Sequence, residues 1–120
     1  MEYFKVIFYE REDGTEPVKD FILGLDKKMR AKVMKELKML SINGTELREP
    51  YSKLLDDGIF ELRAKSGSDI TRVLYFFFVG RKIILTNGFV KKTPKTPPEE
   101  LDRAKRCRSD YLKRKGNNDD

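Results

Sequence analysis

The sequence contains no histidine and a single cysteine, Cys107. One cysteine excludes a disulfide bond within the chain, and without histidine or a second cysteine we do not expect a structural zinc site. The lack of histidine also excludes the Ser-His and Cys-His pairs on which many hydrolases depend. A position in a basic helix can lower the thiol pKa of Cys107. Because no histidine base is present, we interpret Cys107 as a packing residue or as neutral surface.

The sequence also lacks an apolar run of about 18 residues, so we do not expect a membrane span. Its start, an apolar stretch from Tyr3 without a preceding basic region, argues against a signal peptide. Neither a GxxxxGKS/T nor a GxGxxG motif occurs. The carboxylates are scattered, whereas a two-metal nuclease requires them clustered. These absences predict a cytoplasmic domain that uses no cofactor and no metal.

Positive charge is in excess and is unevenly placed. The net charge is +6, yet residues 1–80 hold 14 lysines and arginines against 14 aspartates and glutamates. Residues 81–115 hold 12 against 4. A basic last third favours a polyanionic partner such as nucleic acid. A basic helix that is only a solvated face gives the same pattern, and charge alone does not separate these interpretations.

The hydrophobic pattern predicts one α+β domain over residues 1–115, followed by a disordered tail at 116–120. The expected order is β-α-α-β-β-β-α. Strands are expected at 3–10, 58–65, 71–79 and 82–90, and helices at 17–25, 27–40 and 97–115. Residues 45–58 are interpreted as a connection, because Pro50 interrupts regular structure.

Short turns join the last three strands, so these should form an antiparallel sheet that the first strand joins. The two N-terminal helices should cover one face, and Glu61, Arg63 and Lys65 should lie on the other. In the basic C-terminal helix, Leu101, Ala104, Arg108 and Leu112 line one side.

The stretch GFVKKTPKTPPEELDRAKR, from residue 88, joins the last strand to the last helix. Thr96 is a suitable helix N-cap, and Glu99, three residues later, completes a capping box. Pro97 fits the first turn of the helix, where its missing N–H costs nothing. This local interpretation leaves Lys91 and Lys92 unexplained.

Five basic residues can converge near one end of the predicted sheet. Arg72 is polar at the start of an otherwise apolar strand, and a hairpin places it across from Arg63 and Lys65. Lys91 and Lys92 follow the end of the next strand. Like charges placed together cost energy unless an anion joins them, so the pattern favours a phosphate site.

Ordinary surface ion pairs are the alternative. Arg63 would then pair with Glu61 or Asp69, and Arg72 with Asp56 or Asp57. Spacing alone does not decide between the two.

One reaction suits cations without histidine or metal, namely RNA cleavage by the substrate's own 2′-OH. The protein need only align the nucleophile, stabilise the added negative charge at phosphorus and assist proton transfer. A lysine among other cations has a lowered pKa and can take part in that transfer.

Three stretches carry a resemblance to a known family: YFKVIFYEREDGTEPVKDFILGL, DDGIFELRAK and TRVLYFFFVGRKIILTNGFVKKTPKTPPEELDRAKR. Together they resemble the RelE/ParE toxin superfamily, specifically its phage-protein-like HigB branch, over nearly the whole chain. The resemblance implies a RelE-like fold and the toxin of a type II toxin–antitoxin system. Such a toxin enters the ribosomal A site and cleaves mRNA, and its partner is a helix-turn-helix antitoxin.

The resemblance also implies roles for particular residues. Arg63 and Arg72 match strand positions that contact RNA phosphate and stabilise the transition state, and Lys91 and Lys92 match basic residues after the last strand. Glu61, a position where other members can have lysine, would orient a group or accept a proton. The expected RNA-binding residues are Lys65, Lys95, Arg103, Lys105 and Arg106.

The resemblance does not assign the general acid and the general base of the cleavage reaction. Glu49 resembles a glutamate that some relatives use as base. Several relatives have histidine or tyrosine where this chain has Asn87-Gly88-Phe89.

Two other functions fit the same resemblance. A ParE-like inhibitor would bind DNA gyrase and cut nothing, and a non-catalytic relative would only bind RNA or its antitoxin. The ParE-like function does not need the four basic residues Arg63, Arg72, Lys91 and Lys92.

Overall fold

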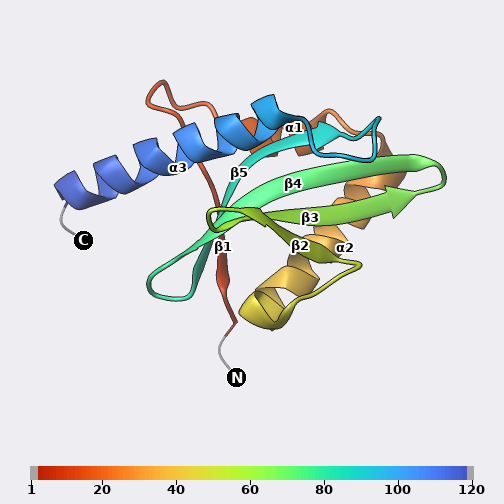
Figure 1. Cartoon of the computed structure of the whole chain (residues 1–120), viewed down its shortest axis with the longest axis horizontal. Helices are drawn as coiled ribbons and strands as arrows, with labels where there is room; N and C mark the ends of the chain where they lie inside the picture. Colours follow the sequence, from red (N-terminus) through yellow and green to blue (C-terminus); the bar gives the residue numbers. More distant parts are fainter. Residues whose placement is uncertain (1–2, 119–120) are drawn as a thin grey trace.

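The computed structural model describes residues 3–118. Its elements are β1 (Lys5–Phe8), α1 (Pro17–Leu23), α2 (Lys27–Asn43), the 3-10 turn η1 (Gly44–Glu46), β2 (Ser52–Asp56), β3 (Ile59–Ser66), β4 (Asp69–Phe78), β5 (Lys82–Val90) and α3 (Pro98–Asn118). Within residues 3–118, five strands form one sheet in the order β1-β5-β4-β3-β2 (Figure 1). The predicted α+β class is confirmed. No helix within this range is both long and apolar enough to cross a bilayer.

Strand β2 lies where the sequence predicted a connection, so that prediction was wrong. Pro50 removes a backbone donor only at its own position, and β2 begins two residues later, at Ser52. The strand pairs antiparallel with β3, with Leu54 opposite Phe60. Because β2 is short and forms the sheet edge, it carries too little apolar alternation to be recognised from its sequence.

Strand β1 joins the opposite edge of the sheet and runs parallel to β5, with Ile7 opposite Ile84. All other neighbouring strands are antiparallel. The sheet is therefore mixed, where the sequence predicted an antiparallel one. Parallel pairing needs a long crossover between the two strands, and here the two helices and three strands between β1 and β5 supply it.

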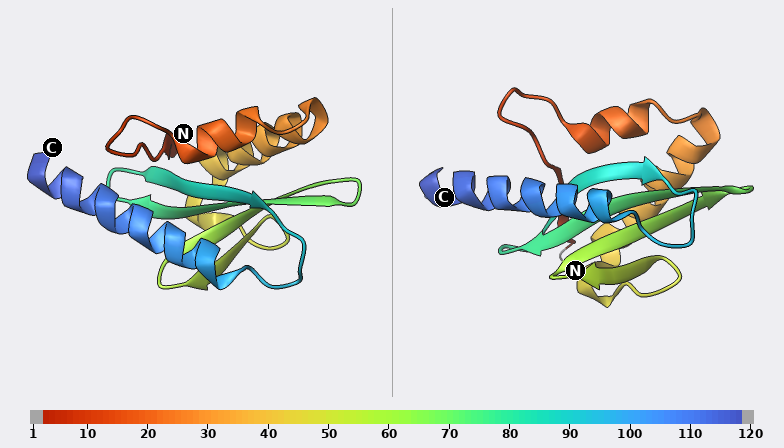
Figure 2. Two further views of the ribbon diagram at one scale, coloured as in Figure 1. Left: turned by 90° about the horizontal axis from the view of Figure 1, so that it is seen from above. Right: turned by 45° about the horizontal axis from the view of Figure 1, so that its top comes forward.

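Helices α1 and α2 cover one face of the sheet, as predicted, and α3 packs on the other (Figure 2). Helix α2 begins where the Asp26 side chain accepts a hydrogen bond from the Met29 N–H at 2.9 Å. It ends at Gly44, whose φ of 51° suits glycine. The buried stripe between those ends consists of Met29, Val33, Glu36, Leu37 and Leu40.

The buried side of α3 differs from the predicted one. Ala104, Cys107 and Tyr111 pack against the sheet, and Leu101 is partly buried beside them. Leu112 is 42% exposed. Leu101 and Ala104 of the predicted stripe are therefore correct, and its second half failed because it placed a charged residue, Arg108, against the core. The helix continues to Asn118, beyond the boundary that we set at residue 115, and Asp119 and Asp120 of the predicted tail lie outside the described residues.

Candidate functional site

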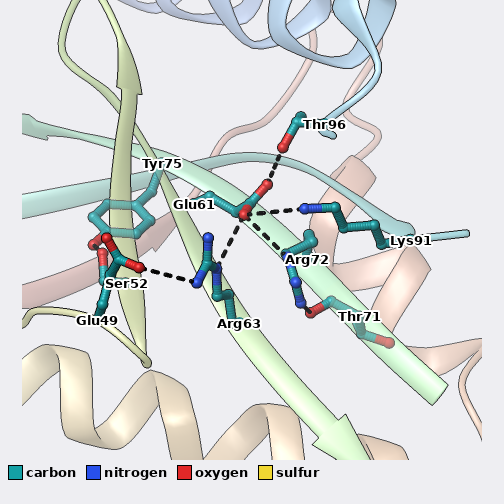
Figure 3. Close-up of polar contacts among 9 residues, drawn as sticks. All are labelled: Glu49, Ser52, Glu61, Arg63, Thr71, Arg72, Tyr75, Lys91 and Thr96. Atoms are coloured by element: carbon teal, nitrogen blue, oxygen red, sulfur yellow. Dashed lines mark hydrogen bonds and ion pairs between the residues drawn. The ribbon is translucent and has the colours of Figure 1, made fainter. Parts of the chain in front are cut away.

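The centre of the site is the carboxylate of Glu61, a side chain of β3 that is 0% exposed. Its Oε1 lies 3.2 Å from Nε of Arg63, 3.0 Å from Nε of Arg72 and 3.9 Å from Nζ of Lys91. Figure 3 shows these three cations around the one carboxylate. The predicted convergence of Arg63, Arg72 and Lys91 is therefore present, with Glu61 at its centre.

Strand pairing explains why these side chains meet. Arg63 of β3 lies directly opposite Arg72 of β4, and Glu61, two residues earlier, is on the same face. Phe89 of β5 lies opposite Arg72, so Lys91, two residues after Phe89, continues on that face. The Lys91 N–H donates to the Ile70 carbonyl at 2.8 Å and extends the β4–β5 pairing by one step.

The site is mostly withdrawn from water. The side chains of Lys91, Arg72 and Arg63 are 7%, 9% and 23% exposed. Burial lowers the pKa of Lys91, Glu61 partly opposes this, and the Arg72 and Arg63 charges lower the pKa further. Burial likewise lowers the pKa of Arg72, against the effect of Glu61. Three positive charges share one buried carboxylate, so the site has an unbalanced positive charge that an anion would neutralise.

The second carboxylate oxygen is held by the loop that leads into α3. Thr96 Oγ1 donates a hydrogen bond to Glu61 Oε2 (Figure 3). The prediction that Thr96 caps α3 was wrong, because its hydroxyl is used in this contact and the helix begins two residues later, at Pro98. This hydrogen bond ties the loop after β5 to the carboxylate at the centre of the cation cluster.

Two charged residues beside the cluster differ from it in exposure. Lys92 is exposed, since it follows Lys91 and points to the opposite side of the extended chain. Glu49 Oε2 lies 3.6 Å from Nη1 of Arg63, and its side chain is 64% exposed. The structure thus brings Lys91 into the site and leaves Lys92 outside, and it places Glu49 at the rim.

The alternative of ordinary ion pairs is correct in one part and wrong in another. Arg63 does contact Glu61. Arg72 does not pair with Asp56, the last residue of β2, or with Asp57, which follows it in the turn to β3; both are held by α3. Lys105 Nζ lies 2.7 Å from Asp56 Oδ2, and Arg108 Nη2 lies 2.6 Å from Asp57 Oδ2.

The five predicted RNA-binding residues separate into two groups. Lys65, Lys95, Arg103 and Arg106 are exposed, and Arg103 also lies 3.3 Å from a carboxylate oxygen of Glu100 in the same helix. Lys105 is half-buried and is held by Asp56 of β2. Part of the positive charge of α3 therefore anchors the helix, and the exposed remainder is available to a polyanion.

The stretch that replaces the histidine or tyrosine of relatives has structural contacts of its own. Asn87 is 3% exposed, and its Nδ2 donates to the backbone and side-chain oxygens of Glu100 at 3.1 and 3.0 Å, which fixes the start of α3. Gly88 lies beneath the Phe21 ring of α1, and Phe89 packs on the α3 side. This stretch holds helices on both faces of the sheet.

Burial changes the expected chemistry of Cys107. It raises the pKa of the thiol, against the weaker opposite effect of nearby arginines such as Arg11 and Arg106. The pKa of this thiol is therefore not lowered by its basic helix, and of the two interpretations the packing one is confirmed, because Cys107 lies in the α3-side core. Among residues 3–118, the histidine, cysteine, aspartate and glutamate side chains form no group of three that could hold a metal ion.

A cleft of about 540 Å³ extends from the cations to α2. It is lined by Lys32, Glu36, Pro50, Tyr51, Arg63, Lys65, Gly67, Ile70 and Arg72. Sequence reasoning missed Glu36, Tyr51 and Thr96. Only Glu36 carried a signal, because it interrupts the apolar stripe of α2.

Comparison with known proteins agrees with the resemblance at the level of the family. A model of phage-derived Gp49-like proteins (DUF891) matches residues 20–109, which include Glu61, Arg63, Arg72, Lys91 and Thr96. A comparison with curated proteins gave no match. The matched segment covers well over half of the chain. The chain therefore belongs to the family of phage-derived Gp49-like proteins (DUF891), which is associated with RelE-like and HigB-like toxins of toxin–antitoxin systems.

Proposed function

We propose that this protein is the toxin of a type II toxin–antitoxin system and that it cleaves mRNA at the ribosome without a metal ion. The observation that carries the proposal is the cluster of Arg63, Arg72 and Lys91 around the single carboxylate of Glu61. Its unbalanced positive charge suits a phosphate that gains negative charge during reaction. The family association supports the toxin assignment.

The reaction is attack of an RNA 2′-OH on the adjacent phosphorus. The 2′-oxygen loses its proton and bonds to phosphorus, the bond to the 5′-oxygen breaks, and that oxygen takes up a proton. The products are a 2′,3′-cyclic phosphate and a free 5′-OH. The nucleophile comes from the RNA, so the protein supplies alignment, charge stabilisation and proton transfer.

We assign these tasks to residues according to their positions in the cluster. Arg63 and Arg72 neutralise the phosphate and the charge that develops on it. Lys91, whose pKa is lowered by burial, protonates the leaving 5′-oxygen. Glu61 is fully buried and occupied by four contacts, so we assign it to holding the cations in place. Glu49, the exposed carboxylate beside Arg63, is our candidate acceptor for the 2′-OH proton.

The ribosome and an antitoxin complete the proposal as partners. Lys65, Lys95, Lys92 and Arg106 are exposed cations that suit contact with ribosomal RNA in the A site. The antitoxin, which the resemblance implies is a helix-turn-helix protein, would keep the toxin inactive. Because the site lacks a histidine acid–base pair, we expect the ribosome to supply part of the substrate alignment.

A reconstituted translation reaction tests the proposal. Primer extension maps the 5′ ends of one mRNA incubated with purified protein, with and without ribosomes. We expect cuts only with ribosomes, and a loss of about 10²- to 10³-fold in rate for Arg72→Ala, the range for a lost oxyanion donor. Arg11→Ala, which removes an exposed arginine from the loop after β1, is the matched control. Intact mRNA beside folded, soluble protein would overturn the proposal and favour gyrase inhibition or a binding-only role.

A further inference from the structure

The cleft beside the cation cluster contains a charged group that the cleavage reaction does not use. Glu36 of α2 is 4% exposed, and its Oε2 has no hydrogen-bond partner among residues 3–118. The same side chain lines the cleft together with Arg63 and Arg72. A buried polar atom without a partner is costly, so a ligand that donates hydrogen bonds to Glu36 would recover that free energy.

The rest of the cleft has the features of a nucleotide site. Its volume of about 540 Å³ lies within the range of small-molecule pockets, roughly 300–1,000 Å³. Arg63 and Arg72 provide a phosphate-binding end. Tyr51, which is 43% exposed, together with Pro50 and Ile70, provides flat and apolar lining for a base. Glu36 lies in the same cleft and can read the edge of that base.

The chemistry of a carboxylate favours one base. Two adjacent carboxylate oxygens are acceptors only. Guanine alone among the RNA bases has two adjacent donors on its Watson–Crick edge, the N1–H and the 2-amino group. Adenine and cytosine place an acceptor beside their amino group, and uracil flanks its N3–H with two acceptors. Glu36 would therefore pair with guanine through two parallel hydrogen bonds and repel the edges of the other bases.

We infer that the cleft binds a guanine of the substrate RNA, next to the phosphate held by Arg63 and Arg72, and that Glu36 selects this base. This inference rests on the proposed function, because it takes the cleaved RNA as the source of the guanine. Lys32 and Lys65 also line the cleft and would attract the flanking phosphates of the RNA.

The inference is tested with two mRNAs. They differ only at the nucleotide beside the mapped cleavage position. One carries guanine there and the other inosine, which lacks only the 2-amino group. We expect the wild-type protein to cut the guanine mRNA at least about fivefold faster, as a bidentate contact discriminates. Glu36→Gln should bring this ratio close to one, since the amide presents a donor to the 2-amino group. A wild-type ratio of one would overturn the inference and leave the cleavage activity intact.

The matched control is Glu46→Gln, the same substitution at an exposed residue of η1 outside the cleft. This variant should keep the wild-type ratio. Thermal melting of both variants shows whether they are folded. The ratio compares two substrates with one protein preparation, so partial unfolding of Glu36→Gln would lower both rates and leave their ratio unchanged.

If no cleavage is seen, a binding measurement tests whether the cleft prefers guanine. An RNA hexamer with a 2′-O-methyl group at the attacking position cannot be cleaved, and its affinity is measured by fluorescence anisotropy with guanine or inosine. A guanine preference that Glu36→Gln abolishes would support the pocket while the cleavage proposal fails. Equal affinities, or no binding, would overturn the inference. If free GMP displaces the hexamer at equal concentration, the cleft serves free guanine nucleotides, and the assignment to mRNA is wrong.

Discussion

Arg63 and Arg72 lie directly opposite one another on the neighbouring strands β3 and β4, with their side chains on the same face of the sheet. Like charges in that position destabilise a pair of strands. Here Glu61 Oε1 accepts a hydrogen bond from Nε of each arginine, at 3.2 and 3.0 Å. One carboxylate therefore keeps the two arginines together. Lys91 adds a third positive charge, which the single negative charge of Glu61 does not balance.

Glu61→Gln should lower the free energy of unfolding by more than the loss of any single one of its ion pairs would. The substitution leaves Arg72 and Lys91 without a counterion and Arg63 with only the exposed Glu49, and breaking a buried ion pair costs on the order of 3–5 kcal/mol. Thermal denaturation in phosphate and in chloride at equal ionic strength provides the measurement. We expect a lower Tm in chloride and a larger recovery by phosphate than in the wild type. An unchanged Tm in both buffers would contradict a counterion role, and Glu46→Gln is the control.

Lys91 and Lys92 should differ sharply although they are adjacent. Lys91→Gln removes a side chain that is 7% exposed and lies 3.9 Å from Glu61, so we expect cleavage to slow by about 10²-fold or more. Lys92→Gln removes an exposed charge and should slow it only a few-fold, mainly at low salt. Rates come from primer extension in the translation reaction. Equal losses for both variants would argue that the lysines act only as general positive charge.

Tyr75 should make the protein unstable at high pH. Burial raises the pKa of Tyr75 from 10.0 to about 12, although its hydrogen bond to Ser52 opposes the shift. A raised folded-state pKa contributes stability below pH 10, and this contribution is lost between pH 10 and 12 because only the unfolded chain ionises there. Chemical denaturation from pH 8 to 11.5 should show this decline, and Tyr75→Phe should make it shallower. The pKa of Tyr9 is also raised to about 12, mainly by burial. Ionisation of Tyr9 therefore accounts for part of the decline in stability that remains in Tyr75→Phe.

Gly88→Ala should loosen the contact between α1 and the sheet. A Cβ at this position would lie 2.4 Å from Cδ2 of Phe21, so the ring must move. Overpacking of this kind costs about 1–3 kcal/mol. Gly24→Ala is the matched control, since its Cβ would meet only ordinary contacts at 3.5 and 3.6 Å. Urea denaturation of both variants gives the comparison, and equal midpoints would show that the Phe21 ring adjusts at no cost.

Much of the site was predictable because it depends on strand alternation. A hairpin between two apolar strands places Arg63 and Arg72 opposite one another, and the position of Lys91 and Lys92 after the next strand brings that pair to the same end of the sheet. The choice between Lys91 and Lys92 was not predictable, because it depends on how far the β4–β5 pairing extends beyond Val90.

Other parts depend on contacts between distant segments, which local patterns do not encode. The Thr96 hydroxyl matches an N-cap in sequence, yet the competing acceptor is 35 residues away, at Glu61. Strand β2 forms only because the edge of β3 is available to it. Glu36 carries a signal as a charge in an apolar stripe, but only the folded chain shows that its carboxylate lines a cleft shared with the arginines.

The shared carboxylate of Glu61 also constrains how this protein can change during evolution. A lineage that loses Arg63 or Arg72 first lowers the excess of positive charge around Glu61, so its site stays foldable while activity is lost. A lineage that loses Glu61 first leaves Arg72 and Lys91 without a counterion and loses stability, unless a compensating change has already occurred. Replacement of Glu61 by another residue is therefore expected only together with changes in its cationic neighbours, so these positions should vary as a group among descendants.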